Sequence, residues 1–232
     1  MNNTYLLINF FILLIPFALS FEKKINFISN IFPLVVSILL SAGLFISWDI
    51  DAARRGDWSF NADYTNSYRI YGLPVEEILF FITVPYSVLF MFECINHYIK
   101  YKDYSKYKPV LLIFSIVLLT AGVLCIGINY TSAVLIISGL IFLLIYFLDS
   151  KIILNRSALA TICISFIPFM IVNYILTSLP VVIYNPDAIT GIRITTIPAE
   201  DFLYSLSLIS MNLFIYVYVK TVHQKKLLQR IR

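Results

Sequence analysis

The sequence predicts an all-α membrane protein with seven transmembrane helices. The first observation is composition: of 232 residues, 60% are hydrophobic and 13% are charged, and the mean hydropathy is +0.87. Soluble domains are roughly half apolar and a quarter charged. The second observation is that the apolar residues gather in runs long enough to cross a bilayer. The third is that the two longest polar connections between these runs resemble each other.

Seven apolar runs have the length of a spanning helix, which is roughly 17–25 residues. The first run also has the length of a secretory signal peptide, but no Lys or Arg precedes it and PFALSFEKK is a poor cleavage site. We therefore expect it to be retained as a helix. The runs occupy about residues 4–20, 31–48, 74–98, 109–128, 130–148, 157–179 and 198–219.

The distribution of basic residues predicts the orientation. Of the 17 Lys and Arg residues, 13 fall in the C-terminal tail and the connections on its side, and 4 fall on the other side. Basic residues concentrate in cytoplasmic connections. The C-terminus is therefore predicted to be cytoplasmic and the N-terminus to lie outside.

Charge and cysteine content argue against several partners. The formal net charge of +4 is spread in short clusters between apolar runs, so no nucleic-acid partner is expected. Cys94, Cys125 and Cys163 lie far apart inside apolar runs and are expected to pack as small hydrophobic residues. His97 and His223 are isolated from each other. The sequence therefore predicts no disulfide and no metal site.

Two segments of the chain align without a gap when the sequence is shifted by 124 positions. Seven of the nineteen positions from 61 to 79 are identical, where composition alone would give roughly one or two. The same shift relates the first three helices to the last three. This predicts a parallel 3+1+3 repeat, with a site at the interface between the copies.

The repeat divides the chain into three parts. Residues 1–107 form the first three-helix repeat, residues 108–128 a linker helix, and residues 129–232 the second repeat with its basic tail. The long polar connections at 49–73 and 180–197 lie on the same predicted side, and each leads directly into an acidic helix start. We expect both helix starts to face one shared cavity.

Each copy begins a helix with a proline followed by two acids. PVEE supplies Glu76 and Glu77, and PAED supplies Glu200 and Asp201. Proline and acids suit the first turn of any helix, so one such motif would indicate only a helix start. Ionisable residues within a membrane are costly, and here the pair occurs twice. We therefore interpret all four as candidates for acid–base catalysis on an apolar substrate.

Aromatic residues follow the acids at helical spacing. Phe80 and Tyr204 each lie four residues after the first acid of their copy and share its helix face. Phe81 is a second aromatic residue in the first copy, where the second copy has Ser205. Because an aromatic face stabilises a nearby cation, Phe80, Phe81 and Tyr204 are predicted to contact the substrate.

Three polar residues precede the helix start in both copies. We expect them to act as turn residues and as an Arg–carboxylate tether between the connection and the helix start, rather than in the chemistry. They are Asn61, Asp63 and Arg69 in the first copy, and Asn185, Asp187 and Arg193 in the second.

The remaining polar residues have simpler interpretations. Trp48 is interpreted as an anchor at the membrane interface. Glu93 and His97, four residues apart, are interpreted as an interfacial pair without a functional role. Some charged residues of the connection after the second helix are expected to form a solvated, ion-paired loop. The candidates are Asp49, Asp51, Arg54, Arg55 and Asp57.

The repeated motifs resemble those of the membrane-integral lycopene cyclases. They are LPVEEILFF at 73–81 and IPAEDFLYS at 197–205, with SWDIDAARRGDWSFN at 47–61 before the first. The chain is similar over nearly its whole length to a fused form of the bacterial heterodimeric type, which is related to the cyclase domain of fungal bifunctional carotenoid enzymes. Ser205 departs from the aromatic pattern, so the two sites are not expected to be equivalent.

The resemblance implies an isomerase of the intramolecular lyase type that closes the linear ends of lycopene, or a related acyclic carotenoid, into ionone rings. It implies acid and base roles for the four acids without saying which acid donates, and one or two rings of β or ε type remain open. It also implies a bacterial inner-membrane location within the lipid bilayer, while contact with other carotenoid enzymes is left open. No GxGxxG motif is present, so no cofactor is expected.

Three other classes fit less well. A SWEET-like small-solute transporter also has parallel 3+1+3 repeats and is the main alternative, but its Pro-Gln motif is missing and both glutamines lie in the tail. A retinal-binding photoreceptor needs a lysine midway along its last helix, and residues 198–219 contain none. A prenyl-transferring enzyme needs aspartate clusters that hold Mg²⁺, and the aspartates at 49, 51 and 57 are loosely spaced and are not repeated.

Overall fold

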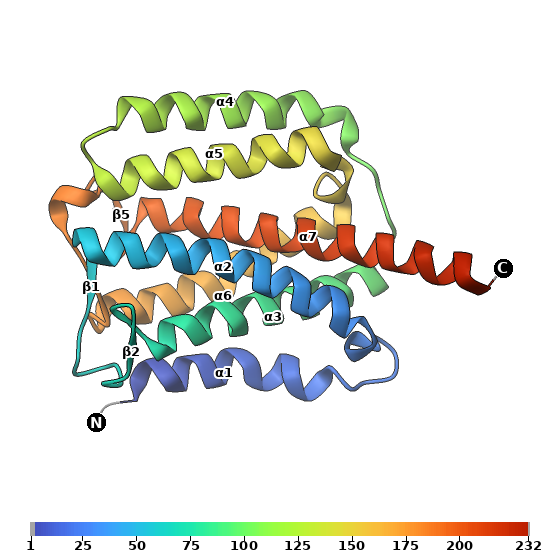
Figure 1. Ribbon diagram of the computed structural model, residues 1–232, viewed down its shortest axis with the longest axis horizontal. Helices are drawn as coiled ribbons and strands as arrows, with labels where there is room; N and C mark the ends of the chain where they lie inside the picture. Colours follow the sequence, from blue (N-terminus) through green and yellow to red (C-terminus); the bar gives the residue numbers. More distant parts are fainter. Residues whose placement is uncertain (1–2, 232) are drawn as a thin grey trace.

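A computed structural model describes residues 3–231, apart from the side chains at 226–228, 230 and 231. These residues form a bundle of helices that run roughly parallel or antiparallel to one another (Figure 1). The helices are α1 (Thr4–Leu19), α2 (Ile31–Arg55), α3 (Val75–Tyr98), α4 (Lys108–Leu124), α5 (Asn129–Asp149), α6 (Arg156–Ser178) and α7 (Ala199–Ile231).

The predicted helical class is confirmed, and the described residues contain six helices long and apolar enough to cross a membrane. The seventh predicted span corresponds to α1, which has 16 residues. At 1.5 Å per residue this helix is roughly 24 Å long, shorter than the roughly 30 Å hydrocarbon core. The seventh span and the orientation of the bundle therefore stay predictions.

Two helices extend beyond their predicted ends. Helix α2 was expected to end at residue 48 but continues to Arg55, where Gly56 ends it in the left-handed conformation with φ of 77°. Helix α7 was expected to end at residue 219 but continues to Ile231, and its end projects beyond the other helices (Figure 1). Both extensions carry charges, which end a hydropathy run without breaking the helical hydrogen bonds.

The bundle has α2, α3 and α7 near its centre, with α1 packed against α3 at one edge and α4 packed against α5 at the other (Figure 1). Helices α4 and α5 approach closely because glycine lies at their contact. A Cβ atom on Gly122 would come within 2.6 Å of Ile136, and one on Gly139 within 2.8 Å of Leu119. Small residues allow this close packing of helices in a membrane.

Large apolar side chains fill the interior along the length of α2, α3, α5 and α7. Phe45, Leu89, Ile145 and Leu213 are fully buried, as is Tyr216. These side chains hold the central helices together and leave the lipid-facing surface to α1, α4 and the outer faces of the others.

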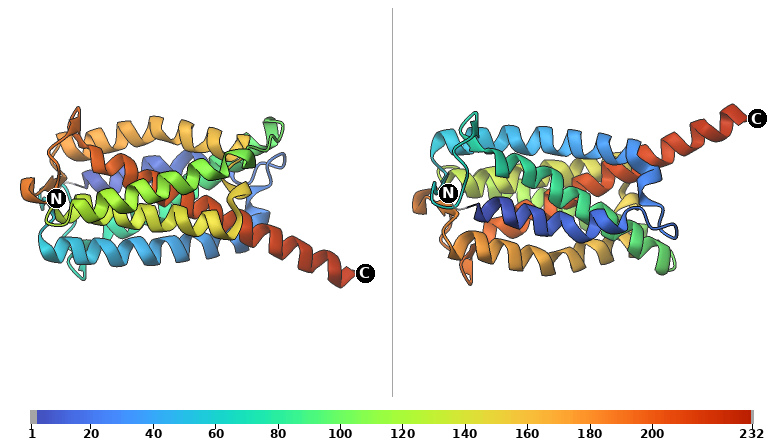
Figure 2. Two further views of the ribbon diagram at one scale, coloured as in Figure 1. Left: turned by 90° about the horizontal axis from the view of Figure 1, so that it is seen from above. Right: turned by 90° about the horizontal axis from the view of Figure 1, so that it is seen from below.

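Short strands close one end of the bundle. Strand β1 (Trp58–Phe60) pairs antiparallel with β4 (Val182–Tyr184), so the two long connections join each other. The hairpin of β2 (Arg69–Ile70) and β3 (Leu73–Pro74) leads into α3, and that of β5 (Arg193–Ile194) and β6 (Ile197–Pro198) leads into α7. All these strands lie at the end opposite the C-terminus (Figure 2).

The remaining short elements are single turns of 3₁₀-helix in the connections. They are η1 (Phe27–Asn30), η2 (Ser105–Tyr107), η3 (Ser150–Ile152) and η4 (Pro186–Ala188). Turn η4 lies between β4 and β5, close to the second acidic helix start.

Candidate active site

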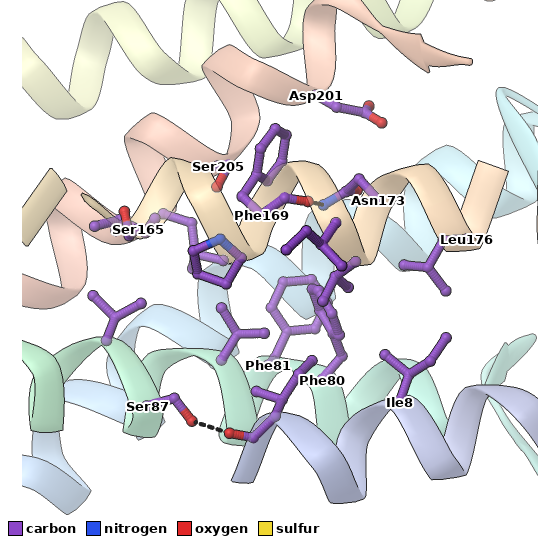
Figure 3. A pocket seen from close by; sticks show the side chains of 18 of the residues that line it. Ile8, Phe80, Phe81, Ser87, Ser165, Phe169, Asn173, Leu176, Asp201 and Ser205 are labelled. Atoms are coloured by element: carbon purple, nitrogen blue, oxygen red, sulfur yellow. Dashed lines mark hydrogen bonds between the residues drawn. The ribbon is translucent and has the colours of Figure 1, made fainter. Parts of the chain in front are cut away.

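A cavity of about 770 Å³ lies between α1 and α3 on one side and α6 and α7 on the other. Figure 3 shows Phe80 and Phe81 of α3 projecting toward α6, which carries Phe169, with Asp201 on α7. The pair of β1 and β4 lines the cavity at the strand end. Most of the lining is apolar, and three of its residues are carboxylic acids: Asp49, Glu77 and Asp201.

Only one acid of the first pair lines the cavity. Glu77 does so, and its Oε2 accepts a hydrogen bond from the hydroxyl of Tyr5 on α1. Glu76 is fully buried elsewhere, and its Oε1 accepts a hydrogen bond from the backbone N–H of Asn66 at 2.7 Å. Glu77 thus faces the cavity, while Glu76 fastens the connection to the start of α3.

The second pair divides in the same way. Asp201 lines the cavity and accepts hydrogen bonds from the hydroxyls of Tyr130 at 2.7 Å and Tyr184 at 2.8 Å. Glu200 accepts from the backbone N–H of Thr190 at 2.7 Å and from the hydroxyl of Thr131 at 2.6 Å. The second acid of each motif therefore lies in the cavity, and the first acid holds a loop.

Asp49 is a cavity acid that was predicted to lie in the polar connection at 49–73, and that placement is wrong. It lies within the extended α2, is 2% exposed, and accepts a hydrogen bond from the hydroxyl of Tyr204 at 2.8 Å. Its carboxyl group is also in hydrogen-bond contact with that of Glu77. A hydrogen bond between two carboxyl groups requires one of them to carry the proton.

Tyr184 lies outside the helices, on β4, and donates to Asp201 from the strand end of the cavity. Burial, together with the nearby charge of Asp201, raises the pKa of its phenol well above the ordinary value. The phenol therefore keeps its proton and acts as a hydrogen-bond donor. The equivalent residue of the first copy, Phe60, has no hydroxyl and cannot do the same for Glu77.

The predicted aromatic residues all line the cavity: Phe80, Phe81 and Tyr204. Trp48 was predicted to be an interface anchor, but it is 7% exposed and packs against Tyr204, with tilted rings whose centroids are 4.7 Å apart. The prediction was wrong because α2 continues past Trp48, which places this side chain inside the bundle. Ser205 also lines the cavity and leaves space where an aromatic ring would project.

The predicted supporting residues lie in the connections, away from the cavity lining. Asn61 and Asn185 form turns, each accepting the backbone N–H two residues later, at Asp63 and Asp187. Both aspartates are exposed.

The two predicted arginines do not form the expected tether to a carboxylate. Arg69 donates to the hydroxyl of Thr65 and lies 6.0 Å from the ring of Phe60, and Arg193 lies 5.9 Å from the ring of Tyr184. Among the side chains that the structure describes, the ion pairs are Arg54–Asp51, Arg55–Asp57 and Lys220–Glu93. The tether is instead made by Glu76 and Glu200.

Glu93 is not paired with His97 as predicted. Its side chain is buried between α3 and α7, where it accepts hydrogen bonds from Lys220 and from the hydroxyl of Tyr216. His97 is exposed. The spacing of four residues suggested a contact between Glu93 and His97. Lys220 of the neighbouring helix makes the contact with Glu93 instead.

Four cavity residues were missed: Tyr5, Asp49, Tyr130 and Tyr184. Shifting by 124 positions places Asp49 opposite Asn173, and both line the cavity, so this polar pair was a usable signal. Tyr5 and Tyr130 occupy corresponding places near the starts of α1 and α5, one position away from that shift. Among the described residues, no three His, Cys, Asp or Glu side chains come together in a way that could hold a metal ion.

Comparison with protein families places these observations in context. A family profile described as lycopene cyclase matches residues 2–95 and 127–219. Each matched segment contains one of the two acid pairs. Searches of curated proteins and of solved structures returned no significant match. Because the two matched segments together cover well over half of the sequence, the chain belongs to the lycopene cyclase family.

Proposed function

We propose that this protein closes the linear ends of lycopene, or a related acyclic carotenoid, into ionone rings by acid–base catalysis. The observation that carries the proposal is the placement of three buried carboxylic acids, Asp49, Glu77 and Asp201, at one end of a mostly apolar cavity. Ionisable side chains in such a place are costly and indicate function. Membership of the lycopene cyclase family supports the same activity.

The reaction needs one proton delivered and one proton removed. A carboxylic acid protonates the terminal double bond at its CH carbon, which leaves a tertiary cation. The electron pair of the neighbouring double bond forms the new C–C bond of the ring, and a carboxylate then removes a proton from a ring carbon to restore a double bond. No net oxidation occurs, so the reaction is an isomerisation, and the two carboxyl roles match a donor and an acceptor in one site.

The shape of the cavity suits one end of a long polyene. Its lining follows α3 from Glu77 to Cys94, which is roughly 25 Å at 1.5 Å per residue. Phe11 and Ile15 of α1 and Ile171 of α6 line the cavity and are also 66%, 65% and 59% exposed. The cavity therefore reaches the apolar outer surface between α1 and α6, where the rest of the polyene would lie in the bilayer.

Aromatic rings surround the acids. Phe81 is buried within 6.5 Å of Tyr204, measured between ring centroids, and Tyr130 lies 5.0 Å from Trp58. The faces of such rings attract a positive charge. They would stabilise the cation between its formation and the loss of the ring proton. They would also keep water, which would capture the cation, away from it.

The protein is a multi-pass membrane protein, and we propose the bacterial inner membrane as its location, with the strand end of the bundle outside. The product would be β-carotene or its monocyclic precursor. The 3+1+3 repeat would then supply one carboxyl group to the cavity from each helix start, which is the arrangement of Glu77 and Asp201.

Expression in bacteria that accumulate lycopene tests the proposal. Pigments extracted from cells that contain the protein should separate by chromatography into cyclised products, and the retention and absorption of these products identify the ring type and number. The matched control is the double variant Glu77→Gln/Asp201→Asn at the same membrane level, which should leave lycopene unchanged. Unchanged lycopene in cells with ample wild-type protein in the membrane contradicts the proposed function.

A further inference from the structure

We propose that Asp49 and Glu77 share one proton and together form the acid that starts ring closure, and that Asp201 is the base that ends it. The inference rests on the proposed function and deepens it, because it assigns opposite roles to the two halves of the chain. Asp49 becomes a catalytic residue outside the two proline–acid motifs.

The hydrogen bonds of the first half indicate a group that holds a proton. Asp49 and Glu77 contact each other through their carboxyl groups. Each also accepts a phenol hydroxyl from a different helix, Asp49 from Tyr204 and Glu77 from Tyr5. With both phenols donating, the hydrogen bond between the carboxyl groups needs a proton from one of the acids themselves. Two buried carboxyl groups in direct contact hold one proton between them because both cannot ionise together.

The hydrogen bonds of the second half indicate a carboxylate. Asp201 accepts two phenol hydroxyls, one on each oxygen, from Tyr130 and Tyr184. Hydrogen bonds donated to both oxygens favour the ionised form of a carboxyl group. Each oxygen retains a second lone pair that can accept a proton from the substrate.

The two halves differ at the positions that produce this contrast. Shifted by 124 positions, Asp49 corresponds to Asn173, so the second half has no carboxyl partner for Asp201. Tyr184 corresponds to Phe60, so the first half has no second phenol for Glu77. The two halves therefore surround their cavity acids with different side chains. Those of the first half keep a proton on the acid, and those of the second half favour a carboxylate that can accept a proton from the substrate.

The proton balance closes within one turnover. The Asp49–Glu77 pair loses its proton to the terminal double bond, and Asp201 gains a proton from the ring carbon as the new double bond forms. Water then takes the proton from Asp201 and returns one to the pair. Because the carboxyl protons exchange with water, a reaction in heavy water places a deuterium in each ring that closes.

The test measures deuterium in both product and recovered substrate. Membranes that contain wild-type protein, D49N, E77Q or D201N are incubated with lycopene in heavy water, and the carotenoids are analysed by mass spectrometry. D201N should reduce ring formation at least about 100-fold, yet still label the recovered lycopene, because protonation can occur and reverse. D49N and E77Q should give neither rings nor label, because each new amide donates to the remaining carboxylate and removes the shared proton.

The control is Asp51→Asn, which changes an exposed acid two positions along the same helix, paired at 3.9 Å with Arg54, and should behave as wild type. Wild-type turnover by D49N overturns the shared acid and leaves the proposed cyclase activity standing. Label in lycopene recovered from E77Q but not from D201N reverses the roles and also overturns the inference. Absence of rings from the wild-type protein contradicts the proposed function itself.

Infrared spectroscopy of the purified protein gives a second measurement that does not depend on turnover. The carbonyl stretch of a protonated carboxyl group, which shifts in heavy water, should be present in wild-type protein and D201N and lost in E77Q. This holds even where D49N fails to accumulate in the membrane. A protonated carboxyl band that persists unchanged in E77Q overturns the shared proton.

Discussion

Glu76 and Glu77 are adjacent in the first turn of α3, yet only Glu77 lines the cavity, while Glu76 accepts the backbone N–H of Asn66 at 2.7 Å. Successive side chains on a helix point about 100° apart, so two neighbouring acids meet different surroundings. Glu200 and Asp201 separate in the same way. The motif therefore combines a side chain that lines the cavity with one that fixes the loop beside it.

Exchanging each acid of the first pair for its amide separates these two roles. Glu77→Gln should lower ring formation at least about 100-fold, because it removes a carboxyl group from the cavity. Glu76→Gln should keep most of the activity and lower the free energy of unfolding by about 1 kcal/mol, because it weakens the hydrogen bond that holds the backbone N–H of Asn66. Turnover in membranes and thermal unfolding in detergent measure the two effects. Loss of turnover in Glu76→Gln with unchanged stability would show that the assignment is reversed.

The phenols on Asp201 should contribute to the rate. Tyr184→Phe removes a hydrogen bond to a charged group, a contact of about 1.5–3 kcal/mol, and is expected to lower kcat about tenfold with little change in KM. Tyr130→Phe should act similarly from the other oxygen. Tyr68→Phe changes an exposed tyrosine on the same side of the bundle and serves as control. Equal rates for all three variants would argue against a role for Asp201.

Ser205 offers a test of where the substrate lies. Ser205→Phe places a ring in the cavity and should raise KM or abolish turnover, because the added volume occupies the space of the polyene. Ser205→Ala leaves the space open and should resemble wild type. Pigment chromatography with both variants at equal membrane levels measures the effect. Normal turnover by Ser205→Phe would place the substrate outside this cavity.

The buried ion pair between α3 and α7 is predicted to support stability without entering the chemistry. Lys220→Ala removes the cation that pairs with the buried Glu93 side chain and leaves the hydroxyl of Tyr216 as its partner, which should lower the free energy of unfolding by about 3–5 kcal/mol. The double variant Glu93→Gln/Lys220→Met should recover most of the loss. Lys225→Ala, which changes an exposed residue one and a half turns further on, is the control. Thermal unfolding in detergent measures the stability of each variant. A larger loss of stability in the double variant than in Lys220→Ala would contradict this account.

The sequence predicted the helical class, the positions of most helices and the four acids of the repeated motifs. It could not say which acid of each pair faces the cavity, because that depends on how α3 and α7 are rotated against their neighbours. Glu76 and Glu77 are chemically alike, and only the loop amide of Asn66 and the hydroxyl of Tyr5 distinguish them.

Asp49 and Trp48 were misplaced for a related reason. Hydropathy ends a predicted span at the first charged residue, whereas the backbone of α2 remains helical until Gly56. An acid in the last turns of a membrane helix therefore has the same sequence signature as an acid in a solvated loop. The amide at Asn173 in the second copy was the available sign that position 49 faces inward.

The pairing of β1 with β4 has a consequence for how the protein is made. Since β1 belongs to the first half of the chain and β4 to the second, the ribosome must deliver both before this end of the bundle can be sealed. In a cyclase built from two separate polypeptides, the equivalents of β1 and β4 would lie on different chains. Their main-chain hydrogen bonds would then form only when the two chains associate.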